Sequence, residues 1–433
     1  MPTWDTTFYA AAGRLDPTKN GKGGEPVKIL LVHCRYRLAG GEDAVFEAER
    51  AMLQAHGHTV VTYERSNEEA TGPAAPKLRK ALLPLTALFS LRTYRDIRRL
   101  LHGGGFDAVH VHNTLLVVSP AVFRAAKAEG VPVVQTLHNF RLFCPNGVLL
   151  RGGQVCEDCP RHGLGCAVKH RCYRGSLAQS LVCAAVYALH RRWGTFRGVQ
   201  FVALTEFDRQ KLLEFNAQRP TFDPDRLTVK PNAVPLTDPP APLPWAQRKR
   251  QIVFAGRLEE LKGIRTALQA WALLRDEDPP TLIVCGTGPL EEECRAAAQG
   301  LAVRFVGYLP KEQLYALLRE SQAALCPSLC YESFALVPAE AHALGTPVLA
   351  SDLGNVGAAV NPGVDGLRFV PGDAAALADA VRRLPTAAPA MDLPAMQAAA
   401  LAAYGPEPNY QQLMALYERC RSSSYPRAKE NRA

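Results

Sequence analysis

The sequence predicts an α/β protein with two domains, each built on a doubly wound parallel sheet. Short apolar runs alternate with helical stretches in both halves of the chain, which is the pattern of parallel strands joined by helices. A stretch with five prolines, 234–247, separates the halves as a stiff connector. Hydrophobic residues make up 47% and charged residues 21% of the 433, so most of the chain is expected to fold as globular domains.

The amino-terminal half combines buried strands with a glycine turn and histidines. Gly40 and Gly41 follow the first strand and precede a helical pattern that runs to about Ala55. Glycine lets a ligand approach the backbone closely, and the helix start favours anions. Strands are expected at 27–32, 58–63, 107–112, 131–136, 200–204 and 227–230.

Three histidines come at the ends of two of these strands. Because the carboxyl ends of parallel strands border the ligand crevice of an open sheet, His138 is a candidate ligand contact. For His110 and His112, a place in the core is an equal alternative.

The segment 77–101 mixes seven Lys and Arg residues with leucines and reads as a basic amphipathic helix interrupted at Pro84. Such a helix either lies on anionic lipid or packs its apolar side on its own sheet, and the second reading is favoured. No run approaches 18 consecutive apolar residues, so no membrane-spanning helix is expected.

Five of the twelve cysteines lie between Phe143 and Tyr173, and Cys156 and Cys159 form a C-x2-C pair. That spacing puts two thiolates on one metal ion, and two further ligands complete a tetrahedral zinc site. The ligand set expected for a structural zinc is Cys144, Cys156, Cys159 and Cys172, with Cys166 or His170 as substitutes. Unliganded thiols and a redox pair are the alternatives.

In the carboxy-terminal half, each strand leads into a turn that can hold ligand. The first turn carries Arg257 and Lys262, whose charges together can neutralise a diphosphate. The next two turns contain Gly286 and Gly288, and then Gly307 and Tyr308. Strands are expected at 252–255, 281–285, 303–306, 323–326 and 348–350.

The stretch 331–351 contains two carboxylates, Glu332 and Glu340, separated by seven residues. Pro338 fits only the first turn of a helix and Gly345 ends one, which predicts a short helix from about Leu336 to Leu344. Its free amides favour an anion. The carboxylate oxygens on either side suit the hydroxyls of a ribose and a sugar, as in a nucleotide sugar.

This E-x7-E pair, with Ser-Phe-Ala-Leu after Glu332 and Ala-Leu-Gly-Thr-Pro-Val after Glu340, resembles the signature of retaining glycosyltransferase family 4. Cys-Pro-Asn-Gly, Cys-x-x-Cys and Arg-Cys-Tyr-Arg-Gly resemble a bacterial polysaccharide-type subset with a Cys-rich insertion. The resemblance implies a GT-B fold, in which two Rossmann-like domains face each other across a cleft. One departure is Ala358, which stands where family members commonly have Glu.

The resemblance also implies residue roles. His138 contacts the donor sugar, Arg257 and Lys262 bind the pyrophosphate, and Glu340 binds the ribose. Glu332 binds the sugar with the amides of the next residues. The remaining substrate-binding candidates are Gly40, Gly41, Gly286, Gly288, Gly307, Tyr308, Ser333, Phe334, Ala335 and Leu336.

These predictions divide the chain into a disordered lead (1–25), an acceptor-binding domain (26–233, with the Cys-rich insertion at 143–174) and a linker (234–249). A donor-binding domain (250–403), a terminal helix crossing back to the first domain (404–420) and a disordered tail (421–433) follow.

The predicted function is retaining transfer of a hexose from a nucleoside diphosphate sugar to a hydroxyl of a lipid-linked or polysaccharide acceptor. No cofactor is expected for catalysis, and nucleic acid is not an expected partner. The expected location is the cytoplasm, with contact at the anionic inner membrane face as an alternative. The rival functions are a nucleotide-sugar epimerase of the same fold and a non-catalytic sugar-binding or metal-sensing module.

Overall fold

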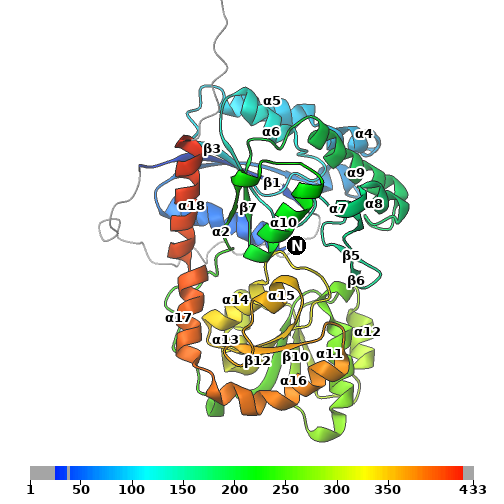
Figure 1. Cartoon of the computed structure of the whole chain (residues 1–433), viewed down its shortest axis with the longest axis vertical. Coiled ribbons are helices and arrows are strands. Elements are labelled where there is room, and N and C mark those ends of the chain that lie inside the picture. Colours follow the sequence, from blue (N-terminus) through cyan, green and yellow to red (C-terminus); the bar gives the residue numbers. More distant parts are fainter. Residues whose placement is uncertain (1–24, 37–39, 423–433) are drawn as a thin grey trace, which may run out of the picture. The chain divides into compact units, whose positions relative to one another are not determined.

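The computed structural model describes residues 25–36 and 40–422 (Figure 1). These form two compact units, which are described separately. The first contains the described residues up to Gly147, then Glu157–Ala233, and the chain from Pro406 onward. The second contains Val148–Cys156 and Val234–Gly405. The predicted lead, 1–25, and tail, 421–433, fall almost entirely outside the described residues.

The first unit is built on a six-stranded sheet in which every strand is parallel to its neighbours, in the order β2-β1-β3-β4-β7-β8. All six strands predicted for this half are present. Because helices cover both faces, the strands read as continuous apolar runs rather than as alternating ones. Their bounds are β1 Lys28–Arg35, β2 Thr59–Ser66, β3 Ala108–Val111, β4 Val133–Thr136, β7 Gln200–Ala203 and β8 Leu227–Val229.

Three helices of this unit, α5, α9 and α10, begin at residues whose side chains cap them. Thr205 accepts the amide of Asp208 at the start of α10, and Ser176 accepts that of Gln179 at the start of α9. The bounds are α2 Gly41–Ala55, α3 Glu68–Thr71, α4 Lys77–Leu88, α5 Leu91–Leu101, α6 Ala121–Ala128, α9 Leu177–Arg192 and α10 Glu206–Gln218.

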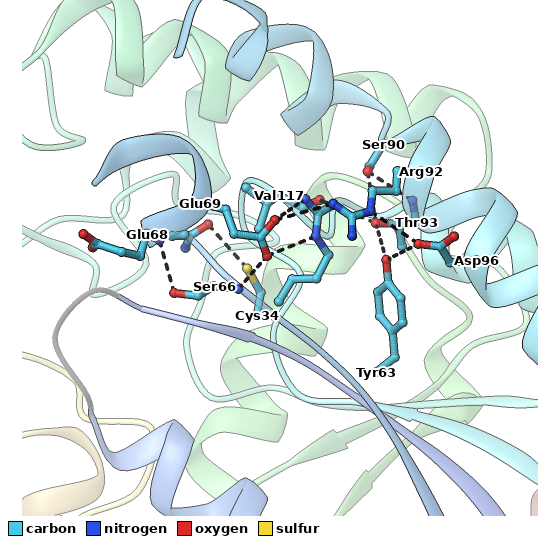
Figure 2. A network of polar contacts seen from close by, with 12 residues as sticks. Cys34, Tyr63, Ser66, Glu68, Glu69, Ser90, Arg92, Thr93, Asp96 and Val117 are labelled. Carbon is cyan, nitrogen blue, oxygen red and sulfur yellow. Dashed lines mark hydrogen bonds and ion pairs between the residues drawn. The ribbon is translucent and has the colours of Figure 1, made fainter. Parts of the chain in front are cut away.

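The single helix predicted over 77–101 is wrong, because the chain forms two helices, α4 and α5. Ser90 causes the break: it has extended backbone and its side chain accepts the amide of Thr93, which starts a new helix. Figure 2 shows the polar network that fixes α5 and α3 beside β2. In it, the Tyr63 hydroxyl lies 3.3 Å from Asp96, and Arg65 pairs with Glu69 at 2.8 Å.

The carboxy-terminal helix α18, Pro406–Ser422, belongs to the first unit. Its apolar side packs into the same core as β1 and α2. Two tyrosines add polar contacts, since the hydroxyl of Tyr410 lies 2.8 Å from His58 and that of Tyr417 lies 2.8 Å from His110. Its core residues are Tyr410, Leu413, Met414, Leu416, Tyr417 and Cys420.

The Cys-rich segment contains a two-stranded antiparallel hairpin, β5 Leu150–Arg151 and β6 Gln154–Val155, followed by two one-turn helices, α7 Asp158–His162 and α8 Gly165–Lys169. The hairpin segment, Val148–Cys156, groups with the second unit, whereas α7 and α8 belong to the first. The sequence assigned the whole insertion to the first domain, so the division differs here.

The second unit repeats the parallel architecture, with strand order β11-β10-β9-β12-β13-β14. Five of these strands were predicted, and β14 was not. Trp271 and Phe254 are fully buried in its larger core cluster. The strands are β9 Lys249–Ala255, β10 Thr281–Cys285, β11 Val303–Gly307, β12 Ser321–Cys326, β13 Val348–Ser351 and β14 Gly366–Phe369.

The helices of the second unit are α11 Ile264–Leu273, α12 Glu291–Ala297, α13 Lys311–Glu320, α14 Leu336–Ala343, α15 Gly354–Ala358, α16 Ala374–Ala387 and α17 Leu393–Tyr404. The short helix predicted from Leu336 is therefore present. Single 3₁₀ turns lie at Pro224–Arg226, Trp245–Gln247, Glu260–Lys262, Arg275–Glu277 and Ala388–Ala390. Within the described part of the chain, no helix has the length and apolar character needed to cross a membrane.

Candidate active site

Lys262 lies in the turn after β9 and pairs with the first carboxylate of the E-x7-E motif, with 2.8 Å between Lys262 Nζ and Glu332 Oε1. Gly263 makes this approach possible. Its φ is +71°, and a Cβ atom built there would lie 1.7 Å from the carbonyl oxygen of Pro327. The turn after β9 therefore packs directly on the turn after β12, which brings Lys262 and Glu332 together.

The Lys262–Glu332 pair is charged and held from several sides. Burial opposes the ammonium form of Lys262, but Glu332 outweighs it and raises the Lys262 pKa above its ordinary value. Ser328 donates to Glu332 Oε1, and the side-chain amide of Asn355 donates to the backbone carbonyls of Glu332 and Ser333. The site thus holds an ammonium in a fixed position.

Arg257, the other predicted cation, is placed differently. Its guanidinium lies 2.6 Å from Glu259, and its side chain is half exposed. To bind an anion, the guanidinium of Arg257 would first have to leave Glu259, so Arg257 is not a preformed anion contact.

The glycine turns of this unit are tied to one another by backbone contacts. Gly286 has a φ of +130°, and a Cβ there would lie 2.0 Å from the carbonyl of Gly256. At Gly288 the corresponding distance, to the carbonyl of Leu258, is 2.5 Å. The Gly286 amide donates to the Gly307 carbonyl at 2.7 Å. Three turns at the carboxyl ends of adjacent strands therefore form one connected backbone surface, next to which Tyr308 is exposed.

Glu340, the second carboxylate of the motif, lies inside α14 and is 1% exposed. Its Oε1 atom accepts the hydroxyl of Tyr315 at 3.1 Å and the ammonium of Lys311. Its Oε2 atom is buried and has no hydrogen-bond partner in the described chain. A buried acceptor without a donor costs about 1–3 kcal/mol, which a ligand hydroxyl placed there would recover.

The start of α14 also keeps unused donors. Ala335 is the N-cap residue, and no side chain accepts the first amides of the helix. Pro338 has no N–H and the amide of Ala339 donates to the carbonyl of Ala335, so the helical amides that remain to bind an anion are those of Leu336 and Val337.

In the first unit, His138 follows β4 and is half-buried. Its Nε2 atom lies 3.0 Å from Nδ1 of His112. The next residue, Asn139, donates to Glu42 at 2.8 Å, which connects this loop to the first turn of α2.

The glycine turn before α2 is anchored by Asp43. One carboxylate oxygen accepts the Gly40 amide at 2.8 Å, and the other lies 2.9 Å from His33 Nε2 in β1. Gly40 is the N-cap of α2 and Gly41 its first residue. The turn therefore stands at a helix start, as predicted.

Comparison with known proteins finds family matches in both halves of the chain. Residues 40–233 match the family described as Glycosyl transferase 4-like domain, and residues 249–386 match the one described as Glycosyl transferases group 1. The chain belongs to the family 4 type of glycosyltransferases. Glycogen synthase of Mycobacterium tuberculosis (strain CDC 1551 / Oshkosh) is 40% identical over 149 residues, covering 32% of this chain and 36% of that protein.

Phosphatidyl-myo-inositol mannosyltransferase of Mycobacterium leprae (strain TN) is 27% identical over 297 residues, which is 68% of either chain. The match to glycogen synthase, by contrast, spans only about a third of the length of that protein. Among solved structures, sucrose-phosphate synthase of Thermosynechococcus elongatus aligns with a TM-score of 0.62 and 20% identity, over 92% of this chain and 100% of that one.

Anabaena HepE in complex with UDP aligns with a TM-score of 0.60 and 16% identity, over 91% of this chain and 100% of that one. At these identities the likeness concerns the fold. The predicted GT-B class is confirmed.

Two of the three strand-end histidines of this glycosyltransferase lie in the core. His110 is fully buried, and both its ring nitrogens have hydroxyl partners, Tyr417 and Thr136, each at 2.8 Å. His112 is 3% exposed. The reading in which His110 reaches a ligand crevice is therefore wrong, whereas His112, although deeply buried, lines a cavity together with His138. The cause is α18, which supplies Tyr417 and covers this part of the sheet, and a helix 300 residues away leaves no local signal in the sequence.

Cys159, in α7, interacts electrostatically with three other cysteines of the segment. Burial, and then Cys144, Cys166 and Cys172, raise the pKa of Cys159 to about 12 when no ion is present. Tight turns connect two of them, since the Cys159 carbonyl accepts the Gly163 amide and the Gly163 carbonyl accepts that of Cys166. Cys156 ends the hairpin segment that belongs to the second unit.

Sequence reasoning missed several residues that shape these sites. Asn355 fixes the backbone at Glu332, and Lys311 and Tyr315 hold Glu340. In the first unit, Glu49 and Lys230 form a buried pair at 2.7 Å. The sequence did offer one signal for Glu49, because it is an acidic residue at a position that falls on the apolar face of α2.

Proposed function

We propose that this glycosyltransferase moves a hexose from a nucleoside diphosphate sugar to a hydroxyl of a lipid-linked or polysaccharide acceptor. The observation that carries the proposal is the Lys262–Glu332 pair beside an uncapped helix start, with the unsatisfied oxygen of Glu340 in the same helix. A cation, free amides and an acceptor oxygen match the diphosphate and the ribose of such a donor. The UDP in the HepE structure supports this choice of donor class.

In this proposal, each donor group has a place in the second unit. The diphosphate is bound by Lys262, by Arg257 once it leaves Glu259, and by the amides at the start of α14. The ribose hydroxyls donate to Glu340, and the hexose contacts Glu332. The base lies against the turns of Gly286, Gly288, Gly307 and Tyr308.

The chemistry is a substitution at the anomeric carbon with retention. The bond from that carbon to the phosphate oxygen breaks, and a bond to the acceptor oxygen forms on the same face of the sugar. The proton of the acceptor hydroxyl passes to the departing diphosphate. Fixed positive charge at the leaving group stabilises the transition state, and removing one such contact typically costs about 10²–10³ in kcat. His138 contacts the hexose of the bound donor.

An anionic membrane surface is the proposed setting of the acceptor. α4 exposes Leu78, Leu82 and Leu85 along one face, and the neighbouring α9 exposes Leu177 and Leu181. The segments that contain these helices, 70–95 and 160–205, carry twelve Lys and Arg residues and no Asp or Glu. The favoured sequence interpretation, that this apolar side packs on its own sheet, is wrong for α4, since Leu78 is 70% and Leu85 is 64% exposed. Two of these arginines pair with acidic residues outside the segments, Arg92 with Glu69 and Asp96 and Arg161 with Glu157. Exposed leucines beside the remaining excess of positive charge suit anionic lipid.

The Cys-rich segment is proposed to hold a structural zinc ion. The thiols of Cys144, Cys166 and Cys172 surround Cys159 closely enough to affect its pKa, and thiolates are the ligands that zinc prefers. Cys156 is the proposed fourth ligand, with Cys166 or His170 as substitutes. When bound, the ion cross-links turns that have little apolar core of their own.

Transfer assays with a panel of uridine and guanosine diphosphate sugars test the function. Lys262→Ala should lower kcat at least 100-fold without unfolding the protein. Arg265→Ala is the matched control, because Arg265 forms an exposed ion pair with Glu293 in the same unit and should change little. An epimerase would consume donor without acceptor, whereas a transferase needs both. Equal activity of the two variants would reject the proposed role of Lys262.

A further inference from the structure

Beneath His138 lies a group of charged and titratable side chains that the proposed chemistry does not use. Glu49 comes from α2, His110 and His112 from β3 and the residue after it, and Lys230 follows β8. All four are less than 5% exposed, whereas His138 is only half-buried. Burying such groups is unfavourable unless they are paired, so their arrangement calls for a physical account.

Two readings fit the positions. Glu49, His110 and His112 each place one ligand atom within 4.8 Å of the others, which would suit a metal ion. The contacts favour the other reading. Lys230 Nζ lies 2.7 Å from Glu49 Oε1 and already neutralises the carboxylate, and both nitrogens of His110 have hydroxyl partners. The group is therefore a hydrogen-bonded chain that leads from an ion pair to His138.

The protonation states along this chain follow from burial and charge. Burial alone would raise the pKa of Glu49, but Lys230 and the two histidines outweigh it and hold that pKa well below its ordinary value. Burial lowers the pKa of His112 and, together with His112 itself, the pKa of His138. At neutral pH, Glu49 is a carboxylate and both histidines are uncharged.

The direction of each hydrogen bond is then determined. The group nearest to His112 Nε2 is the Glu49 carboxylate, whose Oε2 atom lies 3.3 Å away and also lies 3.6 Å from His110 Nδ1. A carboxylate can only accept, so the proton of His112 is on Nε2 and its Nδ1 is an acceptor. That Nδ1 lies 3.0 Å from His138 Nε2, which must therefore donate. His138 is left with an unprotonated Nδ1.

We propose that His112, oriented by the Glu49–Lys230 pair, is a positioning residue that fixes His138 as the Nε2-protonated, uncharged tautomer. His138 Nδ1 then accepts a hydroxyl of the donor sugar. An uncharged ring also avoids placing positive charge beside an anomeric carbon that itself becomes positive as the leaving group departs. This inference rests on the proposed function for its consequence, though the tautomer can be measured without any substrate.

The first test is the tautomer of His138 in the wild-type protein. Histidine labelled with ¹⁵N reports the tautomer through the ring nitrogen shifts, and His138→Gln assigns the signal among the eleven histidines. We expect an Nε2-protonated, uncharged ring between pH 6.5 and 8. A ring protonated on Nδ1, or on both nitrogens, would overturn the inference.

Variants separate positioning from general support of the core. His112→Phe removes the acceptor, whereas His112→Asn keeps an acceptor near the position of Nδ1. His110→Phe is the matched control, since His110 is as deeply buried two residues earlier and has no hydrogen bond with His138, and a phenyl ring keeps its stacking on His112. We expect His112→Phe to lower kcat about tenfold, the equivalent of one hydrogen bond, with the donor KM within about twofold.

His112→Asn should retain most of kcat and the wild-type tautomer, and His110→Phe should lower the Tm but leave kcat within about twofold. An equal loss of kcat in His112→Phe and His110→Phe would reject the positioning role. An inactive wild-type protein with the expected tautomer would refute the proposed function and support the hydrogen-bonded chain. An active protein with the other tautomer would support the proposed function and refute the hydrogen-bonded chain.

Discussion

The exposed leucines of α4 give a prediction that can be worked out from the structure. Leu78, Leu82 and Leu85 lie at helical spacing on one face and are 70%, 44% and 64% exposed. Complete burial of a leucine side chain is worth about 2 kcal/mol. The exposed fractions amount to a little under two full side chains, so insertion of this face into a lipid interface would contribute at most about 3.5 kcal/mol.

We therefore expect the triple variant Leu78→Ser, Leu82→Ser, Leu85→Ser to bind vesicles of anionic lipid up to about 300-fold more weakly than the wild type. Folding should be unaffected, because the replaced side chains are largely in solvent already. Leu273→Ser, at a 55% exposed leucine in the second unit, is the control and should bind like the wild type.

The basic residues of the same helix make a separable contribution. Replacing Lys77, Arg79 and Lys80 with Gln should cost about 1 kcal/mol each on anionic vesicles and nothing on neutral ones, and the loss should shrink as salt rises. Co-sedimentation with vesicles of each composition measures both effects. Equal binding of the triple leucine variant and the wild type would refute the assignment of this face to lipid.

Three further predictions concern the sites. Glu340→Gln should raise the donor KM about tenfold with a small effect on kcat, because the ribose loses a charged acceptor; an unchanged KM in initial-rate assays would contradict this role. Burial lowers the pKa of His110 to about 3, so between pH 6.5 and 3 the unfolded chain binds a proton that the folded chain does not. His110 should therefore contribute a fall of about 1.4 kcal/mol per pH unit to the free energy of unfolding on acidification through this range. Denaturant titrations should show a smaller fall in His110→Phe, and equal slopes would be evidence against a neutral buried His110. Cys159→Ser should lose the zinc that elemental analysis finds in the wild type and should lower the Tm, whereas metal-free wild-type protein would refute the zinc site.

Much of the fold follows from local patterns in the sequence. The strand positions are readable because a parallel sheet covered on both faces requires continuous apolar runs, as at 27–32 and 281–285. The helix from Leu336 was bounded by Pro338 and Gly345, whose backbone limits are local. β14 was missed because Gly366–Phe369 is a short run that includes Arg368 and has no clear apolar pattern.

What the sequence could not supply were contacts between distant segments. One miss was local: the side chain of Ser90 caps a new helix and so divides 77–101, but the leucines and cations on both sides of it suggested one continuous helix. The burial of His110 depends on Tyr417, and the charge of Glu49 depends on Lys230, 181 residues further along the chain. The resemblance to a family identified Lys262, Glu332 and Glu340, but the partner of each comes only from the fold.

Binding of a nucleoside diphosphate to wild-type and Lys262→Ala protein tests the central claim most directly, since it needs neither acceptor nor chemistry. Thermal shift with uridine and guanosine diphosphates should show a rise in Tm for the wild type with at least one of them, and a much smaller rise for Lys262→Ala at the same concentration. An equal rise in Tm for the two proteins would contradict the account, because the diphosphate would then be held without the fixed cation, Lys262, that is assigned to it.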